Sequence, residues 1–138
     1  MAGQPDAAAR GEIAATATLL RRIMYRHVTD DGEGGMRVQS DAFQPQTGEN
    51  DISVHVEEAL EALGLTWEAS LDGHHGFGLV AFPASLVRAV GLEVEINPDP
   101  NDGLRGQAHA SITGDLRSRG IRRALAKGSD VRVWPADP

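Results

Sequence analysis

Histidine and serine side chains lie on the polar side of two predicted β-strands. Ser53 and His55 alternate with apolar residues in one strand, and His109 and Ser111 do so in another. Alternate residues of a strand face the same side of a sheet, so two neighbouring strands would gather the four side chains into one patch. Imidazole and hydroxyl groups donate, accept and transfer protons. The pattern predicts either a chemically useful polar patch or an ordinary solvent-facing strand surface.

Metal and cofactor chemistry is not supported by the remaining residues. The chain has five histidines and no cysteine, so cysteine-ligated zinc and thiol nucleophiles are excluded. His74 and His75 are adjacent, and adjacent side chains of an extended segment point to opposite sides. The glycines at 32, 34 and 35 do not precede the Lys and Ser or Thr of a phosphate-binding loop. We therefore expect no metal site and no cofactor.

Charged residues on two predicted helices are the candidate binding residues. Glu57, Glu58 and Glu61 fall on one helix, where residues four apart lie side by side. Arg119 and Arg123 share a face of a later helix by the same spacing. The first group would attract a basic protein surface and the second an anion, and both patterns are also typical of solvated helix faces.

Periodicity predicts the elements that position these residues. Apolar alternation and short apolar runs predict strands, and acidic starts, Pro and Gly mark the helix ends. The predicted strands are 51–56, 78–82, 92–96, 106–113 and 131–134, and the predicted helices are 57–63, 83–90 and 116–127, the last with Asp115 as its N-cap. Polar sides on several strands favour an antiparallel or mixed sheet. The fold class is therefore α+β, with one sheet and two or three helices mainly on one face.

Three segments complete the domain organisation. Residues 1–11 lack periodicity and are expected to form a disordered tail, which leaves 12–138 as one globular domain. Residues 12–28 fit a helix or a strand, and 29–50 is expected to be a long irregular connection. The apolar faces predict a single core that contains Ile52, Val54, Val56, Leu79, Val80, Leu92, Val94, Ile96, Ile112 and Leu125.

Charge is distributed unevenly along the chain, whose net charge is −7. Residues 30–102 carry fifteen acidic and two basic side chains, whereas 103–134 carry seven basic and two acidic ones. The acidic block predicts a protein partner with a basic surface. Two features argue against nucleic acid as a partner: the chain is acidic overall, and the basic helix lacks interleaved aromatic residues. The absence of a signal-like start and of any run of ~18 apolar residues predicts a cytoplasmic protein without a membrane segment.

Several short motifs resemble those of a family of small bacterial proteins without an assigned activity. The matching pieces are Leu20-Arg21-Arg22-Ile23, Arg37-x-x-Ser40-x-x-Phe43, Ile52-Ser53-Val54, Leu79-Val80-Ala81, Asn97-Pro98-Asp99-Pro100, Ala108-His109-Ala110 with Gly114, and Arg123-x-Leu125-Ala126. Members usually carry Pro-Ser at the positions of Val38 and Gln39, so the match is partial there. Because such proteins often belong to bacterial conflict systems, the resemblance implies an immunity, antitoxin-like or defence-accessory component of bacterial or phage origin.

A weaker resemblance connects the order of elements to the ADP-ribosyltransferase-like fold. Arg21 or Arg22, the connection 29–50 and Ser53 follow one another as they do in that fold. The resemblance implies that Arg22 would hold the NAD pyrophosphate and that Glu93 or Glu95 would stabilise the ribose cation. His55 and His109 would be further catalytic candidates. The leading interpretation is nevertheless a non-catalytic protein-interaction protein, and an enzyme acting on NAD is the alternative.

Overall fold

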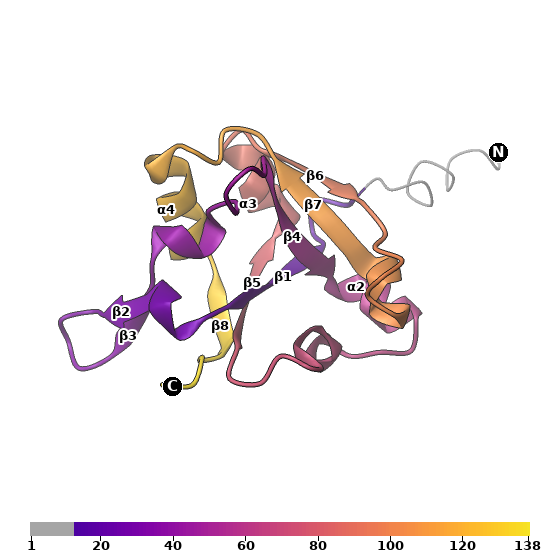
Figure 1. Cartoon of the computed structure of the whole chain (residues 1–138). Helices are drawn as coiled ribbons and strands as arrows, with labels where there is room; N and C mark the ends of the chain where they lie inside the picture. The colour runs from indigo at the N-terminus through magenta and orange to yellow at the C-terminus, as the bar shows by residue number, and fades with distance from the viewer. Residues whose placement is uncertain (1–12) are drawn as a thin grey trace.

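Alternating apolar residues build a six-stranded antiparallel sheet in the computed structural model, which describes residues 13–138 (Figure 1). Its strands, in their order across the sheet, are β6 (Glu93–Ile96), β7 (His109–Thr113), β4 (Asp51–Val56), β1 (Thr18–Ile23), β5 (Gly78–Pro83) and β8 (Asp130–Val133). The predicted α+β class with an antiparallel sheet is confirmed. The tail expected at 1–11 lies outside the described residues.

Within the segment 12–28, whose sequence fits a helix or a strand, residues 18–23 form β1, a strand in the middle of the sheet. It pairs with β5 along its whole length, from Thr18 opposite Pro83 to Ile23 opposite Gly78. Its ladder with β4 is short and joins only Leu19 to Val56 and Leu20 to His55. Leu19 and Leu20 are both buried although they face opposite sides of the sheet. Burial on both faces removes the alternation that would have marked this segment as a strand.

The helices divide between the two faces of the sheet. α3 (Ala84–Ala89), α4 (Arg119–Lys127) and the short 3₁₀ helix η2 (Ser40–Phe43) contribute to the larger core cluster. α2 (Glu57–Ala62), with the 3₁₀ helices η3 (Trp67–Leu71) and η4 (Leu104–Ala108), covers part of the other face. Two of the three α-helices in the described residues therefore share one face.

The core consists of two clusters rather than the single one that was expected. Leu79 belongs to a smaller cluster with Leu20, Leu60, Ala81 and Ala108. Most of the other predicted core residues are buried in the larger cluster, and Ile96 is partly buried against it. The reason is that the sheet is covered on both faces, so alternate residues of its inner strands are buried on both.

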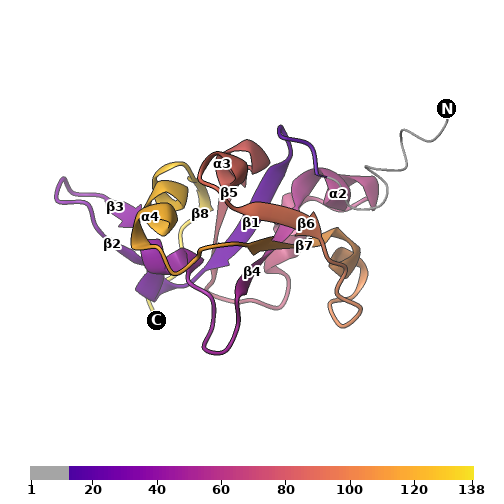
Figure 2. The same ribbon diagram turned by 90° about the horizontal axis from the view of Figure 1, so that it is seen from above.

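The connection 29–50 is more ordered than predicted. β2 (Val28–Asp30) and β3 (Met36–Val38) pair as a hairpin, which projects beside α4 in Figure 2. Gly32 and Gly34 adopt positive φ angles of 85° in its turn, a conformation that glycine enters without steric cost. The Asp31 carboxylate accepts backbone N–H bonds from Glu33 and Gly35, which lowers its pKa. Expecting an irregular segment here was wrong because three-residue strands leave too little alternation to detect.

Two predicted boundaries are also corrected. α4 begins at Arg119, where the Ser118 hydroxyl accepts the backbone N–H of Ile121, so Ser118 rather than Asp115 is the N-cap. β7 begins at His109, because the preceding residues form η4. Within residues 13–138, no helix has the length and apolar character needed to cross a membrane.

Candidate functional site

The predicted histidine–serine patch is assembled by the pairing of β4 with β7. The register places Ser53 opposite Ser111 and His55 opposite His109. The two imidazole rings meet edge to face, with ring centroids 6.1 Å apart. His55 and Ser111 are buried, whereas Ser53 is exposed. The four side chains therefore share one face of the sheet, as their alternation required.

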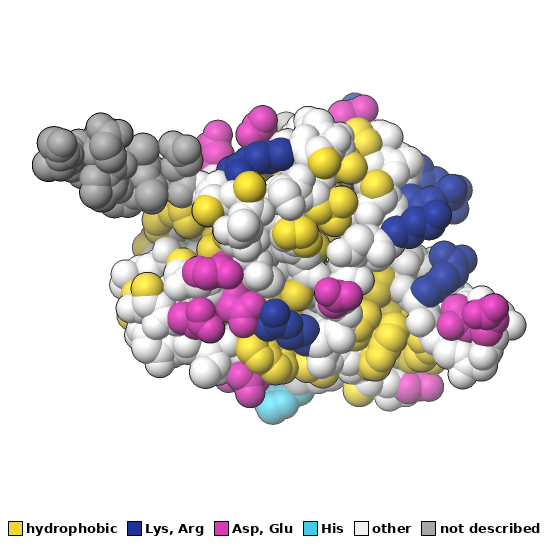
Figure 3. Space-filling view, turned by 180° about the vertical axis from the view of Figure 1, so that it is seen from behind, with side chains coloured by type: hydrophobic (Ala, Val, Ile, Leu, Met, Phe, Trp, Pro, Cys, Tyr) yellow, Lys and Arg dark blue, Asp and Glu magenta, His cyan; other side chains and the backbone are white. Residues whose placement is uncertain are grey.

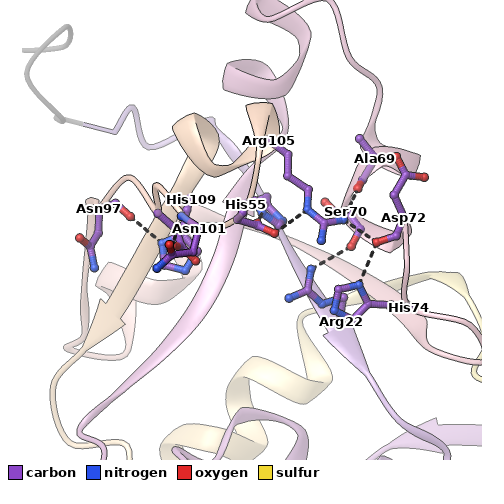
Figure 4. Close-up of polar contacts among 12 residues, drawn as sticks. Arg22, His55, Ala69, Ser70, Asp72, His74, Asn97, Asn101, Arg105 and His109 are labelled. Atoms are coloured by element: carbon purple, nitrogen blue, oxygen red, sulfur yellow. Dashed lines mark hydrogen bonds and ion pairs between the residues drawn. The ribbon is translucent and has the colours of Figure 1, made fainter.

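His55 is the first member of a hydrogen-bonded chain that runs to η4 (Figure 4). Its Nε2 lies 3.0 Å from Asp102 Oδ2, and the other carboxylate oxygen of Asp102 accepts a 2.9 Å bond from Arg105 Nε. Burial lowers the pKa of His55, although the hydrogen bond to Asp102 acts in the opposite direction. Burial also favours the neutral form of Asp102, but the bonds from Arg105 and His55 outweigh it and hold its pKa below the ordinary value.

Two arginines near this chain are bound to backbone carbonyl groups. Arg105 Nη1 donates to the carbonyls of Ala69 at 2.7 Å and Asp72 at 2.8 Å, and Arg22 Nη1 donates to that of Ser70 at 2.9 Å. Burial lowers the pKa of Arg22, and the neighbouring Arg105 charge adds to the effect. Arg22 thus joins η3 to β1, and Arg105 joins the same segment to η4. The Nη1 group of Arg22, one of the donors that would hold a pyrophosphate, is engaged inside the protein.

Little space remains around the patch for a ligand. The cavity bounded by Leu20, Arg22, Ser53, His55 and His109 measures about 40 Å³. His109 Nδ1 lies 2.6 Å from the Asn97 carbonyl, and the Asn97 side-chain amide donates to the Ser111 hydroxyl at 2.9 Å. Ligand sites usually measure about 300–1,000 Å³. The arrangement therefore suits a structural network better than a substrate site.

The carboxylates proposed for the enzymatic alternative lie on the sheet edge. Glu93 and Glu95 are exposed on β6, and β7 and β4 separate them from β1. Three strand spacings place Arg22 about 14 Å from β6. Glu95 lies opposite Ser111, which lies opposite Ser53, so these three groups occupy one row. The structure brings Glu95 near the serines but does not bring it to Arg22.

Two of the three glutamates proposed for partner binding make contacts within the molecule. Glu57 forms a two-bond ion pair with Arg132, with both N–O distances 2.9 Å. Arg132 also stacks over Trp67, 5.6 Å from the ring centroid. Glu58 Oε1 accepts the backbone N–H of Thr18 at 2.9 Å, whereas Glu61 is exposed. Glu57 and Glu58 therefore join α2 to β8 and β1.

Arg119 and Arg123 line a much larger space, which we call the basic groove. It lies between α4, β8 and the β2–β3 hairpin and measures about 630 Å³. The residues that define it are Met36, Arg37, Arg119, Arg123, Lys127 and Trp134. On the face shown in Figure 3, Lys and Arg side chains gather near hydrophobic surface at the end that carries α4 and the hairpin. The groove is larger than the cavity of about 530 Å³ that Asp72, Asp102 and Arg105 line.

The charges of the basic groove are not neutralised by ion pairs. Arg37, Arg119, Arg123 and Lys127 are exposed, and no ion pair between residues 13 and 138 includes any of them. Asp130 is the acidic residue of the lining. Met36 and Trp134 are 39% and 47% exposed, so large apolar side chains lie beside these cations. Sequence reasoning found only Arg119 and Arg123, although Lys127 continues their four-residue spacing.

The same described residues contain no group of three His, Asp or Glu side chains placed to hold a metal ion. No protein-family model, curated protein or solved structure matches this chain. The function must therefore be argued from the groove and the polar network themselves.

Proposed function

We propose that this protein is a non-catalytic binding protein that recognises an acidic segment of another protein in the basic groove. The observation that carries the proposal is a set of four exposed cations around two exposed apolar side chains, and none of these cations has an ion-pair partner within residues 13–138. Arginine forms two-bond contacts with carboxylates, and Trp134 offers a flat apolar surface. A carboxylate-rich segment with apolar residues has the complementary chemistry.

The polar network supports this choice over the enzyme on NAD. Nη1 of Arg22 and Nη1 of Arg105 donate to carbonyl groups, and the cavity that Arg22 lines with His55 measures about 40 Å³. The cavity that Arg105 lines with Asp102 measures about 530 Å³, but Arg22 and the histidines do not line it. The groove is more than tenfold larger than the cavity beside Arg22 and lies within the usual size of a binding site. An immunity, antitoxin-like or defence-accessory role is one form that such binding would take, and it stays a prediction.

The whole-molecule charge favours a protein segment over a nucleic acid. A nucleic acid extends its charge well beyond the groove, where it would meet a protein of net charge −7. A short segment interacts with the four cations locally, because screening reduces charge effects beyond ~8 Å at physiological ionic strength.

The test uses a fluorescent heptapeptide of alternating Glu and Val, capped at both ends, and measures its binding by anisotropy. We expect the affinity to fall as salt rises from about 50 to about 300 mM. The double variant Arg119→Gln, Arg123→Gln should bind about tenfold more weakly, because it loses two charge-assisted contacts. Arg117→Gln is the matched control, since Arg117 precedes the same helix but lies outside the groove lining.

Two results would contradict the proposal. One is peptide binding that is absent, or equal in the double variant and the wild type. The other is tighter binding of an oligothymidylate than of the peptide, which would favour a nucleic-acid partner.

A further inference from the structure

One wall of the basic groove is the end of the sheet. Among the described residues, β8 is the last strand in the order and pairs only with β5, and its position at the sheet end is visible in Figure 1. Asp130 and Val131 of β8, together with Trp134 beyond it, line the groove. β3, an end strand of the two-stranded sheet, lines the other side with Met36 and Val38. Both sides of the groove are therefore strands at the ends of their sheets.

The outer edge of β8 is not paired with another strand of the described chain. Its ladder joins Asp130 to Ala81, Val131 to Val80 and Val133 to Leu79, and a register shift between Leu79 and Val80 leaves Arg132 without a partner in β5. Apart from this ladder, no backbone hydrogen bond of residues 13–138 includes Asp130, Val131, Arg132 or Val133. An uncovered edge strand presents N–H and C=O groups that pair readily with another extended chain.

We propose that the acidic segment binds as an added strand along the outer edge of β8. This inference rests on the proposed function and specifies the conformation of its partner. Main-chain hydrogen bonds would supply affinity, and alternate side chains would supply specificity.

The face of β8 fixes which side chains of the added strand must be acidic. Val131 lies opposite Val80 and packs against the cluster that contains Leu125 of α4. Side chains of an added strand on this face project toward the helix that carries Arg119, Arg123 and Lys127. The partner should therefore carry Asp or Glu at alternate positions, whereas the intervening positions are free to vary.

The experiment compares three heptapeptides that have the same alternating Glu and Val side chains. The first has an unmodified backbone, the second is N-methylated at its Glu residues and the third at its Val residues. Only one of these two sets of N–H groups points toward β8 in an added strand. We expect one methylated peptide to bind about tenfold more weakly than the parent and the other to bind within about twofold of it.

The outcomes separate this inference from the proposed function. Equal binding of all three peptides, with sensitivity to Arg119→Gln, Arg123→Gln, would overturn the added strand and retain the groove. No binding of the parent peptide would contradict both.

Amide exchange provides a second readout that is independent of peptide chemistry. Saturation with the parent peptide should slow exchange of backbone amides in β8, compared with amides of the distant edge strand β6. Unchanged β8 exchange would count against the inference. Protection of β8 that grows with protein concentration in the absence of peptide would instead show that a second copy occupies the edge.

Discussion

Arg21 and Arg22 lie next to each other in β1 and serve opposite faces of the sheet. Arg21 donates to the carbonyls of Ala42 and Ser53, both at 2.9 Å. Arg22 bonds to Ser70 on the other face. Burial, followed by the neighbouring Arg22 charge, lowers the pKa of Arg21 to about 10, so it stays charged at neutral pH. Arg21 therefore joins β1 to η2 and β4, whereas Arg22 joins β1 to η3.

His55 should make the folded state sensitive to mild acid. Its pKa in the fold is lowered from 6.5, chiefly by burial, so the unfolded chain binds more protons between the two pKa values. The stability due to neutral His55 is fully present above pH 6.5 and is lost as the pH falls through the lower folded value. Urea denaturation from pH 7.5 to 5 should show this loss, and His55→Gln should reduce its slope.

His27 contributes to the same slope, since burial also lowers its pKa, so the His55→Gln variant should retain part of the dependence. His75, which is exposed in a turn, provides the control. A slope that changes as much in His75→Gln as in His55→Gln would contradict this interpretation.

At the scale of elements, the start of α4 determines where the groove arginines stand. Replacing Ser118 with Ala removes the hydroxyl that accepts the Ile121 N–H and should cost about 0.5–2 kcal/mol. Asp115→Ala should change stability by less than about 0.5 kcal/mol, because Asp115 is exposed and precedes the cap. Chemical denaturation of the two variants measures both effects. A larger loss for Asp115→Ala would show that the helix begins earlier.

The elements that could be predicted from the sequence are those whose polar and apolar residues alternate within the element itself. β4 and β6 show clean alternation because one side of each is polar. β1 was ambiguous because its two arginines occupy half-buried positions in a central strand and are stabilised by carbonyls far along the chain. Alternation along each strand placed Ser53 with His55 and His109 with Ser111 on polar strand faces. Which of these residues lie opposite one another depends on the register between β4 and β7, which the sequence does not show.

The basic groove could not be predicted from the sequence. Its walls come from the β2–β3 hairpin, α4 and the segment around Trp134, which the fold brings together. A sequence also does not show which charged side chains form ion pairs or hydrogen bonds within the protein. Glu57 and Glu58 share a helix with Glu61, yet only the fold gives them Arg132 and the Thr18 amide as partners.

At the scale of the whole molecule, the acidic block of the sequence is divided among several surfaces. On the face in Figure 3, Asp and Glu side chains form separate groups with basic and hydrophobic surface between them. A continuous acidic face would steer a basic partner over long distances. Separate groups that include internal ion pairs would steer such a partner less.

The triple change of Glu57, Glu58 and Glu61 to Gln should therefore destabilise the fold. The Glu57–Arg132 pair joins residues 75 positions apart, and Glu58 caps the start of β1. Loss of both should cost about 1–3 kcal/mol, because an uncharged amide oxygen accepts weaker hydrogen bonds than a carboxylate does. Thermal and urea denaturation provide the measurement. Glu61→Gln alone is the control and should have the stability of the wild type.

The central position of β1 has a consequence for synthesis on the ribosome. Both of its neighbours, β4 and β5, come later in the chain, so β1 is made before either can pair with it. At about 5–20 residues per second, the span to Pro83 takes seconds to emerge. During that interval Leu19, Leu20 and Ile23 are exposed in a nascent chain that is prone to association. Arg21 and Arg22 interrupt this apolar run with two charges and protect the strand until its partners arrive.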